Sequence, residues 1–221
     1  MVEDEKRRRA PAMSQEERRA AIVRSTLPLL LEHGGNVSTS QIAAAAGIAE
    51  GTVFRAFKDK QELLLACVHA GMNSEAEVAR IAAIGHDGPL HARLTEGVRA
   101  VSGYLDRVWS IGQAARSGGL GPEAMQRRMH GDGEPREPGP PPEFVRVSQA
   151  MGHLFDEVTD NLRVDKERAT RMLLSLVFSN RMRASGFGEP IDDPAEIVDL
   201  FLHGVMDKPH GVTDREKGNH R

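Results

Sequence analysis

The run over residues 38–57, STSQIAAAAGIAEGTVFRAF, constrains the fold of this chain more than any other stretch. It predicts two short helices joined by a tight turn at Gly47, because glycine adopts backbone conformations that other residues resist. The second helix begins with mostly small residues at 49–52, and Arg55 lies further along it. This layout is typical of a helix-turn-helix, in which the second helix enters the DNA major groove.

Three pairs with capping-box spacing define the helices around this motif, because each pair can satisfy free backbone N–H groups at a helix start. The pairs are Ser14–Glu17, Ser38–Gln41 and Asp59–Glu62. They predict helices over residues 14–32, over 38–46 and from 59 onward, with a further helix over 50–57. The apolar residues expected to form the core of this head are Ile22, Leu27, Leu30, Leu31, Ile42, Ala43, Ala46, Ile48, Val53, Phe57, Leu63, Leu64, Cys67 and Val68.

The remainder of the chain also predicts helices, and it contains no alternating strand pattern. Residues 118–142 differ, because six Gly and six Pro indicate an irregular connection with room for one helical turn at 123–129. Asp165 caps one helix, and Asp193 followed by Pro194 starts another. The helices expected in this part cover residues 89–109, 111–117, 143–161, 165–184 and 193–206. We therefore predict an all-α fold.

Composition and charge exclude several classes of protein. The single cysteine, Cys67, excludes an internal disulfide and a multi-cysteine metal site, and it indicates a reducing, cytoplasmic compartment. No apolar run reaches the roughly 18 residues that span a membrane, and no apolar segment follows the basic N-terminal residues as in a secretory signal. Residues 6–60 hold ten Lys and Arg against five Asp and Glu, whereas residues 61–221 hold 19 against 24. A basic head on an acidic body indicates that one end contacts phosphates.

Residues 14–65 resemble the DNA-binding head of the tetracycline-repressor (TetR/AcrR) family. The resemblance rests on a first helix that ends near Gly34 and Gly35, then TSQIAAAAGIAEGTVFRAF, then KDKQELL, in this order and spacing. It covers about a quarter of the chain. The helices after residue 65 fit the family only in their number and length.

The resemblance implies an all-helical homodimer that binds double-stranded DNA at a pseudo-palindromic operator. The chain is expected to divide into a mobile basic arm at 1–13, a helix-turn-helix domain at 14–60, a ligand-binding and dimerisation domain at 61–206, and a disordered tail at 207–221. A small lipophilic molecule bound in the body would release the DNA, as in a repressor. No cofactor, metal or membrane partner is expected, and the expected setting is the bacterial cytoplasm, on the nucleoid.

Candidate DNA-contacting residues follow from residue chemistry together with the resemblance. Arg55 can donate two hydrogen bonds to guanine O6 and N7, worth about 1–3 kcal/mol of discrimination. Gly51 allows close backbone approach, and Lys60 lies where an ammonium group and free helix N–H groups can hold a phosphate. The resemblance directs Thr39, Thr52 and Lys60 toward phosphates, and Glu50, Gly51, Phe54, Arg55 and Ala56 toward the groove. Each could instead be an ordinary surface residue, and Glu50 could serve only its own helix dipole.

Two positions depart from the family pattern. Phe54 stands where tyrosine is usual, so a phosphate contact through a phenolic hydroxyl is lost, and Ala56 stands where histidine is common. The basic run at 6–9 can compensate by reaching phosphates or the minor groove, or it can act only as a solubilising tail. Its arginines are Arg7, Arg8 and Arg9.

Large or adaptable apolar residues of the body are candidates for a ligand pocket, although apolar residues at helical spacing more often form plain core. The candidates are Tyr104, Trp109, Met125, Met129, Phe144, Met151, Phe155, Phe178 and Met182. Tyr104 and Trp109 are preferred, because each adds a polar group to an apolar ring. The segment 118–142 is either a lid over this pocket or a disordered insertion.

Apolar residues of the last two predicted helices are candidates for the dimer interface. They are Leu173, Leu176, Val177, Ile197, Leu200, Phe201 and Gly204. Some of them must instead face the core of their own subunit. A two-fold dimer that presents two heads predicts an operator with matching symmetry.

Two other functions are alternatives to a ligand-responsive repressor. An enzyme is disfavoured, because the chain has no GxSxG, HExxH or P-loop motif and Cys67 lies on an apolar helix face. The alternative is a helix-turn-helix regulator controlled by a protein partner or by its own concentration, without a small-molecule ligand. Ligand-dependent release of a known operator discriminates this alternative from a ligand-responsive repressor.

Deletion of residues 1–10 tests the role of the basic arm. The deletion is expected to lower DNA affinity and to flatten the dependence of affinity on salt, because fewer counterions are released on binding. Salt titrations of the full chain and of the deletion variant measure both slopes. An unchanged slope would reject a role of the arm in DNA binding.

Overall fold

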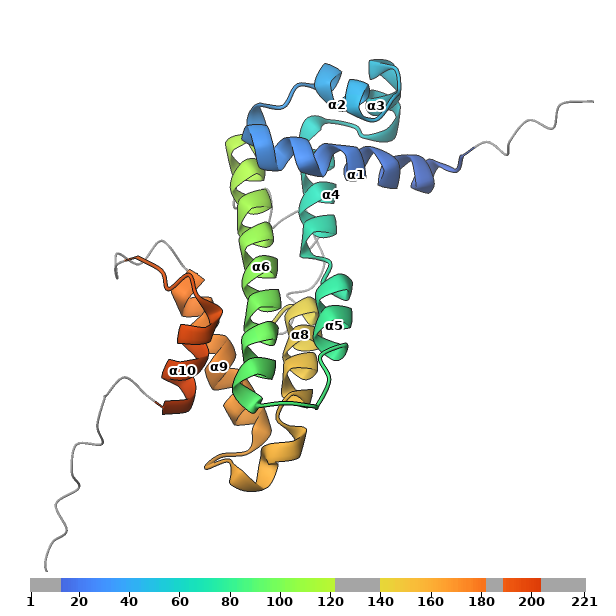
Figure 1. Cartoon of the computed structure of the whole chain (residues 1–221). Helices are drawn as coiled ribbons and strands as arrows, with labels where there is room; N and C mark the ends of the chain where they lie inside the picture. The colour runs from blue at the N-terminus through green and yellow to red at the C-terminus, as the bar shows by residue number, and fades with distance from the viewer. Residues whose placement is uncertain (1–12, 122–139, 182–188, 204–221) are drawn as a thin grey trace, which may run out of the picture. The chain divides into compact units, whose positions relative to one another are not determined.

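The computed structural model describes residues 13–121, 140–181 and 189–203 (Figure 1). Every regular element within these ranges is an α-helix or a short 3-10 helix, which confirms the predicted all-α fold. None of the helices in these ranges is long and apolar enough to cross a membrane. The predicted features that lie outside the described residues are the arm with Arg7, Arg8 and Arg9, the turn at 123–129, Met125, Met129, Met182, Gly204 and the tail.

The chain divides into two compact units, of which the first comprises residues 1–73 and 107–139 and the second comprises 74–106 and 140–221. The long helix α6, Leu90–Ser117, supplies its N-terminal part to the second unit and its C-terminal part to the first. The prediction of separate helices over 89–109 and 111–117 is therefore wrong. The helix continues through Gly112, since one internal glycine costs a helix only about 1 kcal/mol.

The first unit contains four complete helices, three of which begin at the caps expected from the sequence. They are α1 (Gln15–His33), α2 (Thr39–Ala45), α3 (Glu50–Ala56) and α4 (Lys60–Met72), with the 3-10 helix η1 (Gly34–Asn36) after α1. Side-chain oxygens of the cap residues accept from the backbone N–H three residues on, at 3.1 Å for Ser14, 3.2 Å for Ser38 and 2.7 Å for Asp59. The first two caps are complete capping boxes, whereas α3 has no side-chain cap.

The core of the first unit contains most of the apolar residues predicted for it. The buried ones are Ile22, Leu30, Ile42, Ala43, Val53, Phe57, Leu63, Leu64, Cys67 and Val68, and Leu27, Ala46 and Ile48 pack against them. The prediction for Leu31 is wrong, because its side chain is 50% exposed and lies about 100° around α1 from the buried Leu30. Burial raises the pKa of the Cys67 thiol to about 12, so this thiol stays neutral and unreactive.

The backbones of η1 and of the residues after α6 approach closely at Gly35 and Gly118. A Cβ atom added to Gly35 would lie 1.9 Å from Gly118 N and 2.5 Å from Ala114 O, so only glycine fits there. Ser117 Oγ accepts a hydrogen bond from Gly35 N at 3.0 Å, and Gln61 Nε2 donates to Gly119 O at 3.2 Å. Within the first unit, these contacts tie the chain entering the helix-turn-helix to the end of α6.

The second unit contains five helical segments besides η2. They are α5 (Glu75–Ala82), the N-terminal part of α6, α8 (Pro142–His153), α9 (Lys166–Arg181) and α10 (Pro194–His203). Asp165 and Asp193 act as the predicted caps, since their carboxylates accept from Arg168 N at 2.7 Å and from Ala195 N at 2.9 Å. Helix α5 lies in a region for which no helix is predicted.

The helix predicted over 143–161 is shorter in the structure. It ends at His153, because the N–H groups of Leu154 and Phe155 each donate to a carbonyl three residues back at 3.1 Å. This tighter pattern leads into the 3-10 helix η2, Asp156–Asn161.

The second unit has an apolar core, and hydrogen bonds from two polar side chains fix the chain around it. The Phe155 and Phe201 rings meet edge to face with centroids 6.2 Å apart. Buried Arg93 donates to His86 O at 2.6 Å and to Glu157 Oε2 at 2.7 Å, which offsets much of the cost of burying its charge. The Asn180 side chain bonds both backbone groups of Ile191 at 2.8 Å and so fixes the chain that leads to α10.

Gly35→Ala is expected to lower the free energy of unfolding by about 1–3 kcal/mol, because the added methyl group overpacks a backbone contact. Gly51→Ala is the matched control, since no heavy atom lies within 4 Å of a Cβ added there. Denaturant titrations followed by circular dichroism measure both values. Equal stability of the two variants would contradict the close approach of Gly35 to Gly118.

Candidate functional site

Helices α2 and α3 form a helix-turn-helix whose tight turn is centred on Gly47. Gly47 has a φ of +64°, in the left-handed region that favours glycine. The N–H groups of Gly47 and Ile48 donate to Ala44 O at 3.1 Å and to Ala43 O at 3.0 Å, which closes the end of α2. The turn predicted at Gly47 is therefore confirmed.

Helix α3 buries one face and exposes the other. The side chains of Val53 and Ala56 and the following Phe57 are buried, whereas Glu50, Gly51, Phe54 and Arg55 are exposed. The Phe54 side chain is 58% exposed, and nothing lies within 4 Å of a Cβ added to Gly51. The expectation of groove contact at Ala56 is wrong, because this residue is 6% exposed and shares the buried face with Val53.

Arg55 is free to reach a ligand outside the chain. Its guanidinium forms no ion pair or hydrogen bond with any other residue that the structure describes. It stands in the last turn of α3, one residue after the exposed Phe54 ring. Five N–H donors at this position suit guanine recognition.

The three residues expected to meet phosphates lie near helix starts. Thr39 and Thr52 are half-buried in the first turns of α2 and α3. Lys60 is the first residue of α4, and its Nζ donates to Gly35 O at 2.7 Å. Since an ammonium group has three N–H donors, two remain for a phosphate.

Arg19, on α1, holds the junction between α3 and α4, and sequence reasoning missed it. Its guanidinium donates to Ala56 O and, at 2.7 Å, to Glu62 Oε1, and it lies 4.1 Å from the Phe57 ring centroid. The other oxygen of Glu62 accepts from Lys58 N at 2.7 Å. A single arginine thus fixes the end of the helix that carries Arg55. One arginine among several on α1 gives no local signal of this role.

The same contacts set the charge state of Glu62. The Lys58 backbone hydrogen bond and then the Arg19 side chain lower the pKa of this carboxyl below its ordinary value. A lowered pKa in the folded state contributes stability above the ordinary carboxyl pKa, and this stability is lost as the pH falls through the lowered value.

Arg19→Met is expected to weaken DNA binding while the chain stays folded. The methionine keeps apolar contact with Phe57 but cannot hold Ala56 O or Glu62, so the end of α3 is no longer fixed. The pKa of Glu62, followed by nuclear magnetic resonance, should rise toward its ordinary value. The control is Arg24→Met, an exposed position on the same helix. Unchanged DNA affinity together with an unchanged Glu62 pKa would contradict this role.

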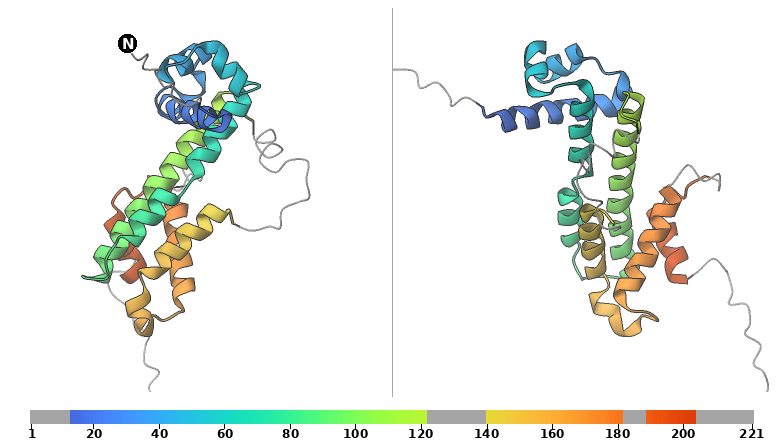
Figure 2. Two further views of the ribbon diagram at one scale, coloured as in Figure 1. Left: turned by 90° about the vertical axis from the view of Figure 1, so that its right-hand side faces the viewer. Right: turned by 180° about the vertical axis from the view of Figure 1, so that it is seen from behind.

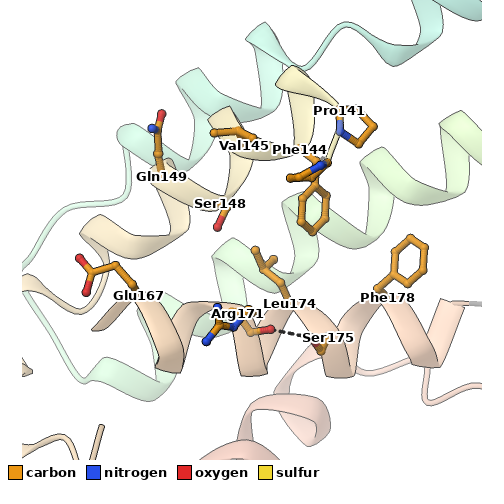
Figure 3. Close-up of a pocket in the computed structure, with 11 residues that line it drawn as sticks. Pro141, Phe144, Val145, Ser148, Gln149, Glu167, Arg171, Leu174, Ser175 and Phe178 are labelled. Atoms are coloured by element: carbon orange, nitrogen blue, oxygen red, sulfur yellow. Dashed lines mark hydrogen bonds between the residues drawn. The ribbon is translucent and has the colours of Figure 1, made fainter. Parts of the chain in front are cut away.

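A groove of about 570 Å³ lies in the second unit between α8 and α9, which run side by side (Figure 2). Its apolar lining comes from Pro140, Pro141, Phe144, Val145, Leu174 and Phe178, and its polar lining comes from Ser148, Gln149, Glu167, Arg171 and Ser175. Figure 3 shows these side chains along both walls. A space of this size, largely apolar with a few polar groups, suits a small organic molecule.

Of the six predicted pocket residues that the structure describes, two line this groove, Phe144 and Phe178. Met151 and Phe155 are fully buried in the core of the second unit, and Tyr104 is also buried. Trp109 belongs to the first unit and is partly exposed, with the Arg116 guanidinium 5.5 Å from its ring centroid. Within the described ranges, no group of three or more His, Cys, Asp or Glu side chains could hold a metal ion.

The residues predicted for a dimer interface separate into two sets. Leu173, Val177 and Ile197 are buried in the core of their own unit, so they offer no surface to a partner. Leu176 is 44% exposed, and Leu200 and Phe201 are half-buried. Met172, four residues before Leu176, is also exposed and was not predicted. Of the predicted interface residues that the structure describes, Leu176, Leu200 and Phe201 therefore keep accessible surface.

Residues 22–67 match the family model described as bacterial regulatory proteins, tetR family. None of the curated proteins matches the chain. Among solved structures, a TetR-family transcriptional regulator from Mesorhizobium loti is 16% identical, with a TM-score of 0.57 over 85% of this chain and 96% of its own. A transcriptional regulator from Saccharomonospora viridis in complex with choline is 19% identical, with a TM-score of 0.56 over 87% of this chain and 100% of its own. FadR from Bacillus subtilis in complex with stearoyl-CoA is 15% identical, with a TM-score of 0.50 over 85% of this chain and 99% of its own.

Proposed function

We propose that the chain is a regulator of the tetR family, whose model matches residues 22–67, and that it acts as a ligand-responsive, sequence-specific DNA-binding repressor. In this proposal, a homodimer occupies a pseudo-palindromic operator and leaves it when a small lipophilic molecule binds in the body. The chain acts by binding alone, without a catalytic step. Its setting is the bacterial cytoplasm, on nucleoid DNA.

The exposed face of α3 is the observation that carries the proposal. A helix that buries Val53 while exposing Gly51, Phe54 and Arg55 has the orientation needed to enter a groove. Gly51 lets the backbone approach the DNA, and Arg55 supplies the guanidinium that reads guanine. Phe54 offers an apolar edge that suits a thymine methyl group.

Phosphate contacts would fix the register of this helix. Thr39, Thr52 and Lys60 stand at the starts of three successive helices, and their hydroxyl and ammonium groups can donate hydrogen bonds to phosphate oxygens. Lys60 also bonds Gly35 O, so its side chain is already directed in the protein without DNA. This preorientation lowers the entropic cost of holding a phosphate.

The exposed apolar residues of α9 support the dimer in the proposal. Met172 and Leu176 lie one turn apart on this helix, and both are exposed. Neighbouring large apolar side chains on a surface indicate an interaction site. We assign the contact between the two copies to these residues together with Leu200 on α10.

The groove between α8 and α9 supports the ligand response. Two proteins of the same fold were solved with organic molecules bound, choline in one and stearoyl-CoA in the other. A ligand that binds better to the form without DNA shifts the equilibrium away from the operator, by linkage.

Selection of bound fragments from the source genome with the purified chain tests the proposal. We expect a pseudo-palindromic site, and an affinity that falls steeply with salt because Lys and Arg displace counterions from DNA. Arg55→Gln should cost about 1–3 kcal/mol at one base pair of each half-site. The control, Arg80→Gln, changes an exposed arginine of α5 and should leave the selected sequence unchanged. No enriched site at low salt, with folded helical protein, would contradict the proposal.

Operator release separates the two modes of control. Small molecules extracted from the source cells should release the purified protein from its site. Release only by a macromolecular fraction, or only on dilution, would favour control by a protein partner or by the concentration of the chain itself.

A further inference from the structure

The two walls of the groove between α8 and α9 change from apolar to polar in the same direction. Helices α8 and α9 run in opposite directions along the groove, so that Phe144 lies near Phe178 and Gln149 lies toward Glu167 (Figure 3). Two independent stretches of sequence therefore build one apolar end and one polar end. A plain gap in a core would not show this order.

The apolar end is lined by Pro141, Phe144, Leu174 and Phe178. The Phe178 side chain is 46% exposed, although it is a large apolar group. A flat apolar body placed between the two phenylalanine rings would cover this surface.

The polar end carries a guanidinium that pairs with no acidic side chain of the described residues. Arg171 forms no ion pair with any residue within the described ranges. Lys166 bonds Asp156 at 2.6 Å, and Arg168 lies 3.8 Å from Asp165, so these neighbouring cations are already paired. Glu167, one turn before Arg171, lines the same end of the groove, so the Arg171 guanidinium is the group there that can hold an anionic head.

We propose that the groove binds an amphipathic organic anion, with its apolar body between Phe144 and Phe178 and its acidic head on Arg171. This inference rests on the proposed function, because it names the class of effector that the body takes. A guanidinium holds a carboxylate or sulfonate through paired hydrogen bonds, and Ser148 and Gln149 can complete the contact. The helix from Glu167 to Phe178 rises about 16 Å, enough for a fused-ring body and its head.

A second copy of the chain is a less suitable occupant. On α9 the groove residues Arg171, Leu174 and Phe178 follow one side of the helix, and Met172 and Leu176 follow another. Successive helical residues are about 100° apart around the axis, so these two stripes are separated by more than a quarter-turn. The buried Leu173 and Val177 lie between them. The groove and the proposed dimer face can therefore be occupied at the same time.

A pair of matched fluorescent probes tests the inference on the full chain. Anilinonaphthalene sulfonate is an aromatic anion, and N-phenylnaphthylamine is the same ring system without the charge. Arg171→Gln should weaken the anionic probe about tenfold and leave the neutral probe unchanged, because only the charged contact is removed. Phe178→Ala should weaken both probes, and Glu167→Gln should strengthen only the anionic one.

Arg168→Gln is the matched control, since Arg168 is exposed on the same helix but does not line the groove. Hydrogen exchange with the anionic probe bound should slow over residues 142–149 and 167–178. Equal effects of Arg171→Gln and Arg168→Gln, or protection elsewhere, would overturn the inference. Loss of probe binding when protein concentration drives dimerisation would also overturn it, in favour of a second copy in the groove.

Operator binding by the Arg171→Gln variant distinguishes the two proposals. The variant should bind the selected operator as the unmodified chain does, because Arg171 lies outside the head. If cell extracts release the operator but neither probe depends on the groove residues, the repressor proposal stands and the anion site fails. If no operator is found while the probes respond as expected, the anion site stands and the repressor proposal fails.

Discussion

The backbone at Gly35 and the backbone at Gly118 pack directly against each other, because neither residue has a side chain. The first unit is organised around this contact. A methyl group on Gly35 would force the two segments apart. Two side chains also form hydrogen bonds with the Gly35 backbone, since Ser117 accepts from Gly35 N and Lys60 donates to Gly35 O. One small residue thus sets the path of the chain into α2 and directs the lysine at the start of α4.

The recognition helix is short, so its orientation depends on what holds its two ends. At the N-terminal side, the left-handed turn at Gly47 sets the angle between α2 and α3. At the C-terminal side, Arg19 ties Ala56 O and Glu62 to α1. The seven-residue helix α3 can therefore expose Phe54 and Arg55 to solvent. Contacts with its neighbours stabilise the helix, and these two side chains do not.

The caps and turns of the head could be predicted from neighbouring residues, whereas contacts between residues far apart in the sequence could not. Caps and turns depend on residues three or four apart, so Ser14, Ser38 and Gly47 could be interpreted directly from the sequence. Arg19 could not, because its partners lie 37 and 43 residues away. The same limit applies in the body, where three of the six pocket candidates that the structure describes, Tyr104, Met151 and Phe155, are buried. The groove emerges only when α8 and α9 are placed antiparallel, which aligns Arg171 with polar residues of the facing helix.

Guanine methylation interference on the selected operator tests most directly whether the exposed face of α3 reads DNA bases. Methylation at guanine N7 blocks the atom that Arg55 is proposed to contact in the major groove. We expect interference at one guanine in each half-site with the unmodified chain, and loss of that signal with Arg55→Gln. An interference pattern that is identical for both proteins would contradict the assignment of base recognition to α3.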